Sequence, residues 1–265
     1  MKCDLCPRKC LVDRKKGEKG ICGQTENLKV ARAALHFWEE PCISGDAGSG
    51  AVFFSGCPLH CVFCQNENIA NGTVGKEISL ERLVDIFLEL QEKRANNINL
   101  VTPGHFVPQI VKALDQARRE GLTLPVVYNT SSYETVDTIK MLEGYVDIYL
   151  PDFKYMSPVL SKKYSHAPDY AEVAKAAIAE MVRQTGKAVF VNGDEDNLIL
   201  SGTIVRHLTL PGCMADSMQI LKYLHETYGD MIYISIMNQF TPLSNLEKYP
   251  ELNRRITDEE YETLV

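Results

Sequence analysis

Residues 55–66 read SGCPLHCVFCQN and contain three cysteines, Cys57, Cys61 and Cys64, at the spacing C-x3-C-x2-C. Three thiolates at this spacing can converge on one iron–sulfur cluster, but they are one ligand too few for a cubane of four irons. One iron would keep an open coordination position, which is typical of metal sites that carry out chemistry. The alternative is a structural zinc site whose fourth ligand lies elsewhere, with three candidates: His60, Cys42 and Cys213.

A second group of cysteines precedes this motif, at the spacing C-x2-C-x3-C-x11-C: Cys3, Cys6, Cys10 and Cys22. Four cysteines can close a tetrahedral site, for zinc or for a second iron–sulfur cluster, and the spacing does not choose between them. Because closed four-cysteine sites are usually structural, we predict a metal that supports folding. The chain opens with no secretory signal, so its nine cysteines indicate metal ligands rather than disulfides.

The composition is that of a globular enzyme. The chain has 265 residues and a formal net charge of −7, and its 45% hydrophobic content is enough for one large core, so we expect one main domain. An acidic chain makes nucleic acid an unexpected main partner, since nucleic-acid sites have a basic footprint. No apolar run approaches the ~20 residues that span a bilayer, which predicts a cytoplasmic protein without a membrane partner.

After residue 50 the sequence alternates strand and helix patterns, which favours a parallel sheet or barrel. Residues 28–50 are rich in turn residues and are predicted to be a connector. Residues 189–191 and 198–200 flank a surface hairpin. Helices are predicted at 79–94, 108–121, 133–143, 169–185 and 215–228. Six parallel strands are predicted at 51–55, 97–101, 125–129, 146–150, 204–210 and 231–237.

The motif at 55–66 resembles the signature of the radical S-adenosylmethionine (SAM) superfamily, C-x3-C-x-aromatic-C, with Phe63 as the aromatic residue. The resemblance implies that Cys57, Cys61 and Cys64 bind a [4Fe-4S] cluster whose open iron binds SAM. Reductive cleavage of SAM would then give a 5'-deoxyadenosyl radical that abstracts hydrogen from a substrate. Phe63 would lie against the adenine. A reductant such as flavodoxin or ferredoxin is an implied partner.

Six strands match the α/β fold of that superfamily, a partial (β/α)6 radical SAM barrel, here with a small N-terminal Cys-rich metal-binding segment. We expect the Cys-rich N-terminal metal-binding segment and its connector to cover residues 1–47, the radical SAM core residues 48–240 and a C-terminal tail residues 241–265. Relatives continue further than Val265, so we expect a shortened tail. In such barrels the active site lies at the carboxyl ends of the strands. Each predicted strand does end in a polar or glycine-containing segment.

Several further motifs resemble the activating enzymes of pyruvate formate-lyase, especially their PflX-like relatives. These are CLCPR-like residues 4–8, EPCISG at 40–45, CQN at 64–66, YNTS at 128–131 and RHLTLPG at 206–212. The resemblance implies that the substrate is a protein or a small molecule, including a partner enzyme that acquires a glycyl radical. The contrasting interpretation is a non-catalytic iron–sulfur or zinc-binding protein, which would have no use for a SAM site.

The same resemblance implies SAM contacts at three strand ends. Arg206 would lie near the SAM carboxylate, since a guanidinium offers a rigid fork to a carboxylate. Ile204 and Arg206 are two positions apart on the predicted strand, so their side chains point to the same face as other apolar residues. A structural arginine held in an ion pair is therefore the alternative. The ribose and carboxylate contacts would come from Asn129, Thr130 and Ser131. The sulfonium region, SAM or the substrate would be contacted by Asp152 and Lys154.

Two positions depart from the family pattern. The second strand should end in Gly-Gly-Glu, which binds the SAM amino group, but here it ends in Thr102-Pro103-Gly104-His105. We therefore take Thr102, Gly104 and His105 as candidate SAM contacts without choosing the group that receives the ammonium. Gln65-Asn66 replaces the His-Asn that is usual in pyruvate formate-lyase activators, so the substrate is left open.

Overall fold

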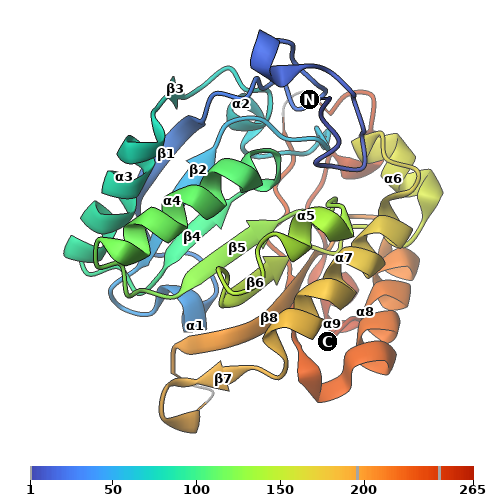
Figure 1. Cartoon of the computed structure of the whole chain (residues 1–265). Coiled ribbons are helices and arrows are strands. Elements are labelled where there is room, and N and C mark those ends of the chain that lie inside the picture. The colour runs from blue at the N-terminus through green and yellow to red at the C-terminus, as the bar shows by residue number, and fades with distance from the viewer. Residues whose placement is uncertain (1, 195–196, 244–245) are drawn as a thin grey trace.

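A computed structural model of the chain describes residues 2–194, 197–243 and 246–265. A nine-stranded sheet forms its centre, in the order β3-β1-β2-β4-β5-β6-β8-β7, with β9 on β8 (Figure 1). Six strands pair in parallel across it: β2 (Ser49–Phe54), β4 (Ile98–Val101), β5 (Val126–Thr130), β6 (Ile148–Pro151), β8 (Ile199–Leu208) and β9 (Tyr233–Met237). The six predicted parallel strands are therefore confirmed.

The prediction for residues 28–50 was wrong in part, because the supposed connector contains strand β1 (Lys29–His36). This strand pairs antiparallel with β2, and its other edge pairs with β3 (Lys76–Glu77). Three of its eight residues are alanine, which has low strand propensity, so long-range pairing rather than local preference makes the strand. After β1 the chain forms a single helical turn, α1 (Pro41–Ser44), that begins with proline.

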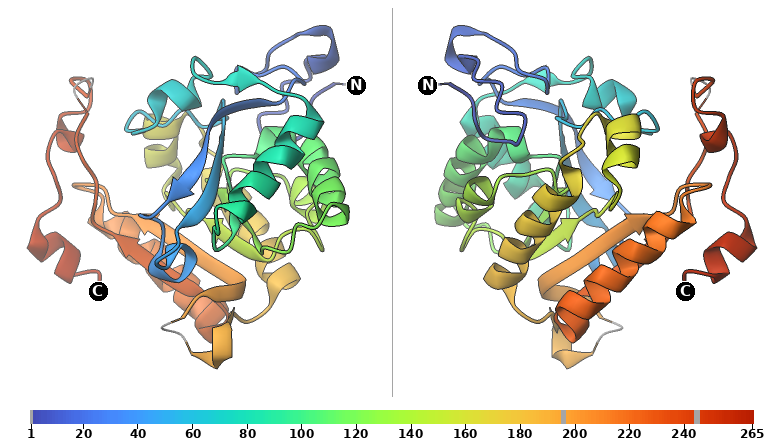
Figure 2. Two further views of the ribbon diagram at one scale, coloured as in Figure 1. Left: turned by 90° about the vertical axis from the view of Figure 1, so that its left-hand side faces the viewer. Right: turned by 90° about the vertical axis from the view of Figure 1, so that its right-hand side faces the viewer.

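Helices cover one face of the sheet, as two further views show (Figure 2). The predicted helices appear as α3 (Leu80–Glu92), α4 (Val107–Arg119), α5 (Val136–Lys140), α7 (Tyr170–Thr185) and α8 (Met214–Tyr228). The predicted N-cap is confirmed, because the Ser79 side chain accepts a hydrogen bond from the Arg82 backbone. The segment predicted as helix 133–143 is helical only in α5. Helix α6 (Pro158–Ser165), capped by Ser157, was not predicted.

The two faces of the parallel strands pack against different partners, because successive side chains on a strand point to opposite sides. Residues such as Val126 and Tyr128 join the large core beneath α3 and α4. Their neighbour Val127 packs on the other face with Ile43 from α1. The segment after β1 therefore crosses the inner face of the open barrel and fills its lower part.

The last segments attach at the open edge of the barrel. Strand β7 (Val189–Phe190) pairs antiparallel with β8, which confirms the predicted hairpin. The second arm of this hairpin is the start of β8. Its turn includes residues 195–196, which lie outside the described residues. In the tail, Tyr261 of α9 (Asp258–Glu262) donates a hydrogen bond from its hydroxyl to the Ile236 carbonyl at 3.1 Å. In the part of the chain that is described, no helix is long and apolar enough to cross a membrane.

Candidate active site

The three-cysteine loop begins where β2 ends, at the carboxyl edge of the parallel sheet. Gly56 turns the chain with a φ of 92°, a conformation that favours glycine. The Cys57 thiol accepts backbone N–H groups of Leu59 and His60, and its pKa rises to about 12 because it is buried and lies near Cys61. Burial thus keeps the free thiol neutral, whereas a metal would bind its deprotonated form.

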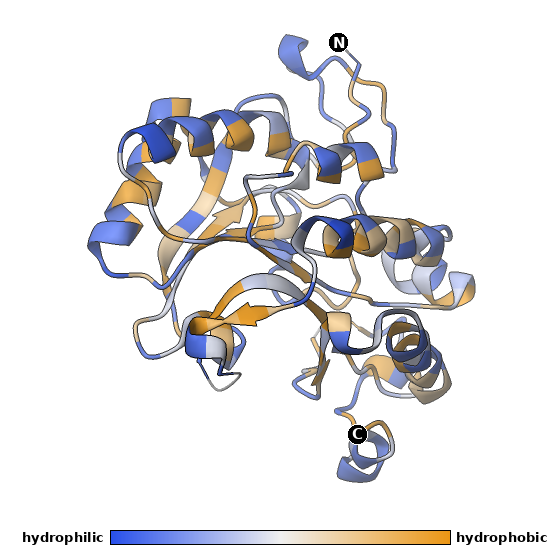
Figure 3. Ribbon diagram, turned by 60° about the horizontal axis from the view of Figure 1, so that its bottom comes forward, coloured by the Kyte–Doolittle hydropathy of each residue, from blue (hydrophilic) through white to orange (hydrophobic). Residues whose placement is uncertain are grey.

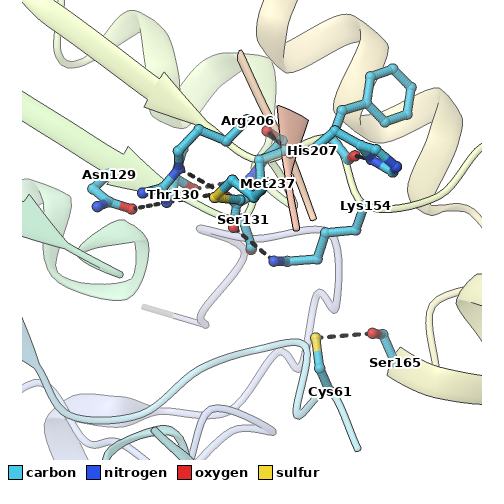
Figure 4. A network of polar contacts seen from close by, with 12 residues as sticks. Cys61, Asn129, Thr130, Ser131, Lys154, Ser165, Arg206, His207 and Met237 are labelled. Atoms are coloured by element: carbon cyan, nitrogen blue, oxygen red, sulfur yellow. Dashed lines mark hydrogen bonds and ion pairs between the residues drawn. The ribbon is translucent and has the colours of Figure 1, made fainter. Parts of the chain in front are cut away.

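The loop's cysteines have a cavity and a hydroxyl donor beside them. Among the described residues, no three or more His, Cys, Asp or Glu side chains are arranged to hold one metal ion, and this holds for Cys57, Cys61 and Cys64 as it does for the four N-terminal cysteines. A cavity of about 250 Å³ opens beside Cys61 and Cys64, with Tyr249 from the tail on its wall. Ser165 donates its hydroxyl to the Cys61 sulfur at 3.0 Å (Figure 4).

Arg206 on β8 is the centre of a network of charged and polar groups across the inner face (Figure 4). Its Nη1 lies 2.6 Å from Glu39 Oε1, its Nε 3.0 Å from Asp152 Oδ1, and its Nη2 2.9 Å from Asn129 Oδ1. The side chains of Arg206, Glu39 and Asp152 are only 13%, 11% and 16% exposed. The paired arginine left open by the sequence is therefore what the structure contains, with most of its fork already engaged.

Asp152 and Lys154 form the outer end of this network. Lys154 Nζ donates to Asp152 Oδ2 at 2.7 Å. Burial opposes ionisation of Asp152, but the charges of Arg206 and Lys154 outweigh it and lower the pKa of the carboxyl. Lys154 also interacts electrostatically with Cys61, and this ammonium lies between the cysteine loop and the barrel network (Figure 4).

Asn129, Thr130 and Ser131 follow one another but do not face one site. Asn129 donates its amide to Glu39 Oε2 at 3.0 Å on the inner face. The next side chain, Thr130, points away and donates to Glu134 at 2.8 Å. The backbone carbonyl of Ser131 accepts the Tyr170 hydroxyl. His207 likewise points away from Arg206, because its Nδ1 donates to the Phe153 carbonyl.

The residues that follow β4 pack against neighbouring segments, and their side chains do not take part in the Arg206 network. Thr102 has a φ of 54°, rare for a β-branched residue, and donates its N–H to the Asn129 carbonyl. His105 donates from Nε2 to the Ser55 carbonyl at 2.7 Å, while its buried Nδ1 has no partner among the described residues. Burial lowers its pKa to about 4, so the ring is neutral. A side chain at Gly104 would collide with the carboxylate of Glu134.

Phe63 and the N-terminal cysteines each lie in a defined environment. The Phe63 ring packs edge-on against Tyr155, Tyr164 and Phe240. Cys10 accepts the Ile21 N–H at 3.3 Å. Backbone N–H groups also reach two other sulfurs of the segment, since Arg8 donates to Cys6 and Gln24 to Cys22, and each of these thiols interacts electrostatically with Cys10. Cys3 is close enough to act on Cys22. The four cysteines thus share one folded segment, in which no three of them are arranged to hold one metal ion.

Sequence reasoning missed two acidic residues. Glu39 belongs to the segment taken for a connector, directly before the Glu40-Pro41 pair that resembles the family, and that motif was the signal that could have found it. Glu134 is fully buried over Tyr128 and Thr130, and burial raises its pKa to about 7. Nothing in its local sequence distinguishes it from a surface glutamate.

Comparison with known proteins agrees with this geometry. The model of the "Radical SAM superfamily" matches residues 51–197, which is more than half of the chain and includes the cysteine loop. The "Uncharacterized protein MJ0674" of Methanocaldococcus jannaschii is 28% identical over 98% of this chain and 72% of its own length.

Two solved structures share the fold at a TM-score of 0.51 and 14% identity. One is HydG, a maturase of the [FeFe]-hydrogenase, matched over 79% of this chain and 46% of HydG. The other is methylornithine synthase (PylB), matched over 77% of this chain and 57% of PylB, so the chain spans about half the length of either structure. With its mostly parallel α/β sheet and its three-cysteine loop, the chain belongs to the radical SAM superfamily, whose enzymes cleave SAM with a [4Fe-4S] cluster.

Proposed function

We propose that Cys57, Cys61 and Cys64 hold the [4Fe-4S] cluster and that SAM lies between this loop and the Arg206 network. The observation that carries the proposal is the position of three thiols at the carboxyl end of β2, of which Cys61 and Cys64 line a cavity and interact with a buried cation, Lys154. When bound, the two cofactors supply one-electron cleavage of a carbon–sulfur bond in SAM, followed by hydrogen abstraction from the substrate. The chain supplies positions and charges for these groups.

Which inner side chains contact SAM directly, and which only position others, follows from the hydrogen-bond donors that each still has free. An ammonium has three N–H donors, and Lys154 gives one to Asp152, so it has donors for SAM. Arg206 has five N–H donors, and Glu39, Asp152 and Asn129 occupy most of them. Asn129 gives one of its two amide N–H donors to Glu39 and, among the described residues, keeps the other. We therefore propose Lys154 and Asn129 as direct contacts, with Arg206 positioning Asn129 directly and Lys154 through Asp152. Thr102, Gly104, Thr130 and His105 are expected to act through packing.

The finer proposal is that the hydrogen donor is a glycine of a partner enzyme. Its support is the resemblance of residues 128–131 and 206–212 to pyruvate formate-lyase activating enzymes and their PflX-like relatives. A gene for a glycyl-radical enzyme beside this one would supply the candidate partner. Incubating that partner with the reduced protein and SAM should give a glycyl-radical signal in electron paramagnetic resonance, and a silent spectrum would count against this substrate.

We further propose that Cys3, Cys6, Cys10 and Cys22 bind a separate metal, zinc or an iron–sulfur cluster, that orders the first ~25 residues. The N–H donors aimed at three of these sulfurs are the support, since hydrogen bonds to ligand sulfurs stabilise metal-bound thiolates. A Cys3→Ala/Cys6→Ala variant should lose this metal and expose the segment to protease, because metal binding is coupled to folding. Unchanged metal content and protease resistance would exclude the site.

Cysteine variants test the catalytic assignment. Cys57→Ala, Cys61→Ala and Cys64→Ala should each lose the reconstituted cluster and, under dithionite, the conversion of SAM to 5'-deoxyadenosine. Cys42→Ala is the matched control, because this half-buried thiol lies at the opposite end of the barrel. Conversion at the wild-type rate in any of the three loop variants would rule out the assignment.

A further inference from the structure

The N-terminal segment, residues 2–25, has a charge opposite to that of the protein as a whole. Residues 1–25 contain seven Lys or Arg and three Asp or Glu, whereas the whole chain contains 28 and 35. The segment projects from one end of the molecule, beside the ends of β2 and α5 (Figures 1 and 3). A compact cationic surface on an acidic protein selects an acidic partner and speeds its association.

The exposed side chains of this segment include both charged and apolar groups. Its "basic face" consists of three exposed lysines and two exposed apolar residues: Lys9, Lys16, Lys19, Leu11 and Ile21. Leu11 and Ile21 are 53% and 49% exposed, although residues of this type are usually buried. Lys15 pairs with Glu26 at 3.9 Å, but within the described ranges Lys9, Lys16 and Lys19 form no ion pair. A protein partner can cover such exposed apolar side chains while its own charges meet the lysines, since interfaces combine an apolar core with a polar rim.

The segment that carries the basic face packs against the cluster loop. The Ile21 carbonyl accepts a hydrogen bond from His60 Nε2 at 2.7 Å. Arg8 donates to the Pro58 carbonyl at 2.9 Å, and the Cys22 carbonyl packs against Gly56. A protein bound on this face would therefore be held next to Cys57, Cys61 and Cys64.

We propose that the basic face is the docking surface for an acidic electron-transfer protein that reduces the cluster. This inference rests on the proposed function, because reductive cleavage of SAM consumes one electron from outside the chain. The donor's reduced flavin or iron–sulfur centre loses one electron, the cluster gains it, and no atom is transferred. An acidic electron carrier matches both the charge of the face and the position of its segment against the loop.

Charge reversal tests the docking surface. The variant Lys9→Glu/Lys16→Glu/Lys19→Glu is compared with Lys93→Glu/Lys187→Glu/Lys222→Glu, three exposed lysines outside the N-terminal segment. Each protein is reconstituted, and 5'-deoxyadenosine formation is measured against the concentration of reduced flavodoxin, of reduced plant-type ferredoxin, and of dithionite. Binding of the oxidised donors is titrated in parallel.

We expect the basic-face variant to need at least about tenfold more flavodoxin or ferredoxin at low salt, with a smaller difference at high salt because exposed charges are screened. Its rate with dithionite should equal that of the control. The proposal is overturned if the two variants respond alike to both protein donors, or if the wild type takes electrons from neither. A wild type that cleaves no SAM even with dithionite contradicts the proposed function instead, and the binding titration still decides the docking surface.

Discussion

The barrel network and the N-terminal segment are fastened in opposite ways. In the network, three charged side chains neutralise one another: Glu39, which lies between β1 and α1, Asp152, which follows β6, and Arg206 on β8. In the segment, arginines donate to backbone carbonyls instead, as Arg14 does to Thr25 and His105. Breaking the first should disturb the whole sheet, whereas breaking the second should free the segment and leave the barrel folded. The predictions below probe this difference.

The largest effect is expected from Arg206→Met. Removing the cation leaves Glu39 and Asp152 buried without their partner, which costs about 3–5 kcal/mol of unfolding free energy. SAM affinity should fall as well, since Asn129 and Asp152 lose their orientation. Denaturant unfolding and equilibrium SAM binding are the measurements. Arg82→Met, which breaks exposed pairs with Asp85 and Glu89, should lose much less, and equal losses in the two variants would contradict the contrast.

Glu39 marks the limit of what could be predicted from the sequence. The six parallel strands, their helices and Arg206's position at the site follow from apolar periodicity and motifs. Glu39 meets Arg206 from 167 positions away, and it does so only because β1 pairs with β2 and α1 packs beneath the barrel. No local pattern encodes such a contact. Alternation along β8 did warn that Arg206 shares a face with Ile204, and the paired arginine is what the structure contains.

The next effect concerns Glu134, which lies between the two regions and acts on the pKa of Cys6. Burial raises its pKa to about 7, above the value of an unfolded glutamate. At low pH the carboxyl is protonated in both the folded and the unfolded state, so it does not lower the free energy of unfolding. Stability is then lost as pH rises from about 4.5 past 7. Since one pKa unit corresponds to about 1.4 kcal/mol, the loss is about 3 kcal/mol at pH 8.

Glu134→Gln should remove this dependence. Urea unfolding of both proteins in the same metal state should give similar stabilities at pH 5 and a more stable variant at pH 8. The amide keeps an oxygen for the hydroxyls of Thr130 and Tyr128. Parallel pH profiles for the wild type and the variant would show that the carboxyl does not titrate in this range.

Arg14→Met tests how the segment is fastened. Arg14 is buried, donates twice to the Thr25 carbonyl and once to that of His105, and stacks on Phe106 at 5.4 Å. Its loss leaves buried carbonyls unsatisfied, at about 1–3 kcal/mol. Limited proteolysis should cut within the first ~25 residues while the barrel fragment stays intact. Cleavage throughout the barrel would mean that the two regions unfold together.

The smallest effect is expected at Arg8, which joins the two regions. It donates to the carbonyls of Pro58, Ser165 and His166, and its guanidinium lies 5.1 Å from the centre of the Tyr133 ring. Because the group is partly exposed, water can replace these bonds, so Arg8→Ala should cost only about 1 kcal/mol. The more informative measurement is the stability of the cluster, because Pro58 lies inside the cluster loop and Ser165 donates a hydrogen bond to the Cys61 sulfur.

The Arg8 variant should therefore keep its fold but lose its cluster faster. The rate of iron release to a chelator should rise, whereas the thermal midpoint should move little. Arg8→Lys separates charge from geometry, since one ammonium cannot span three carbonyls as a planar fork does. If iron release is unchanged in both Arg8 variants, the segment rests on the loop without supporting it, and the contacts of Ile21 with His60 and of Cys22 with Gly56 must hold the two regions together.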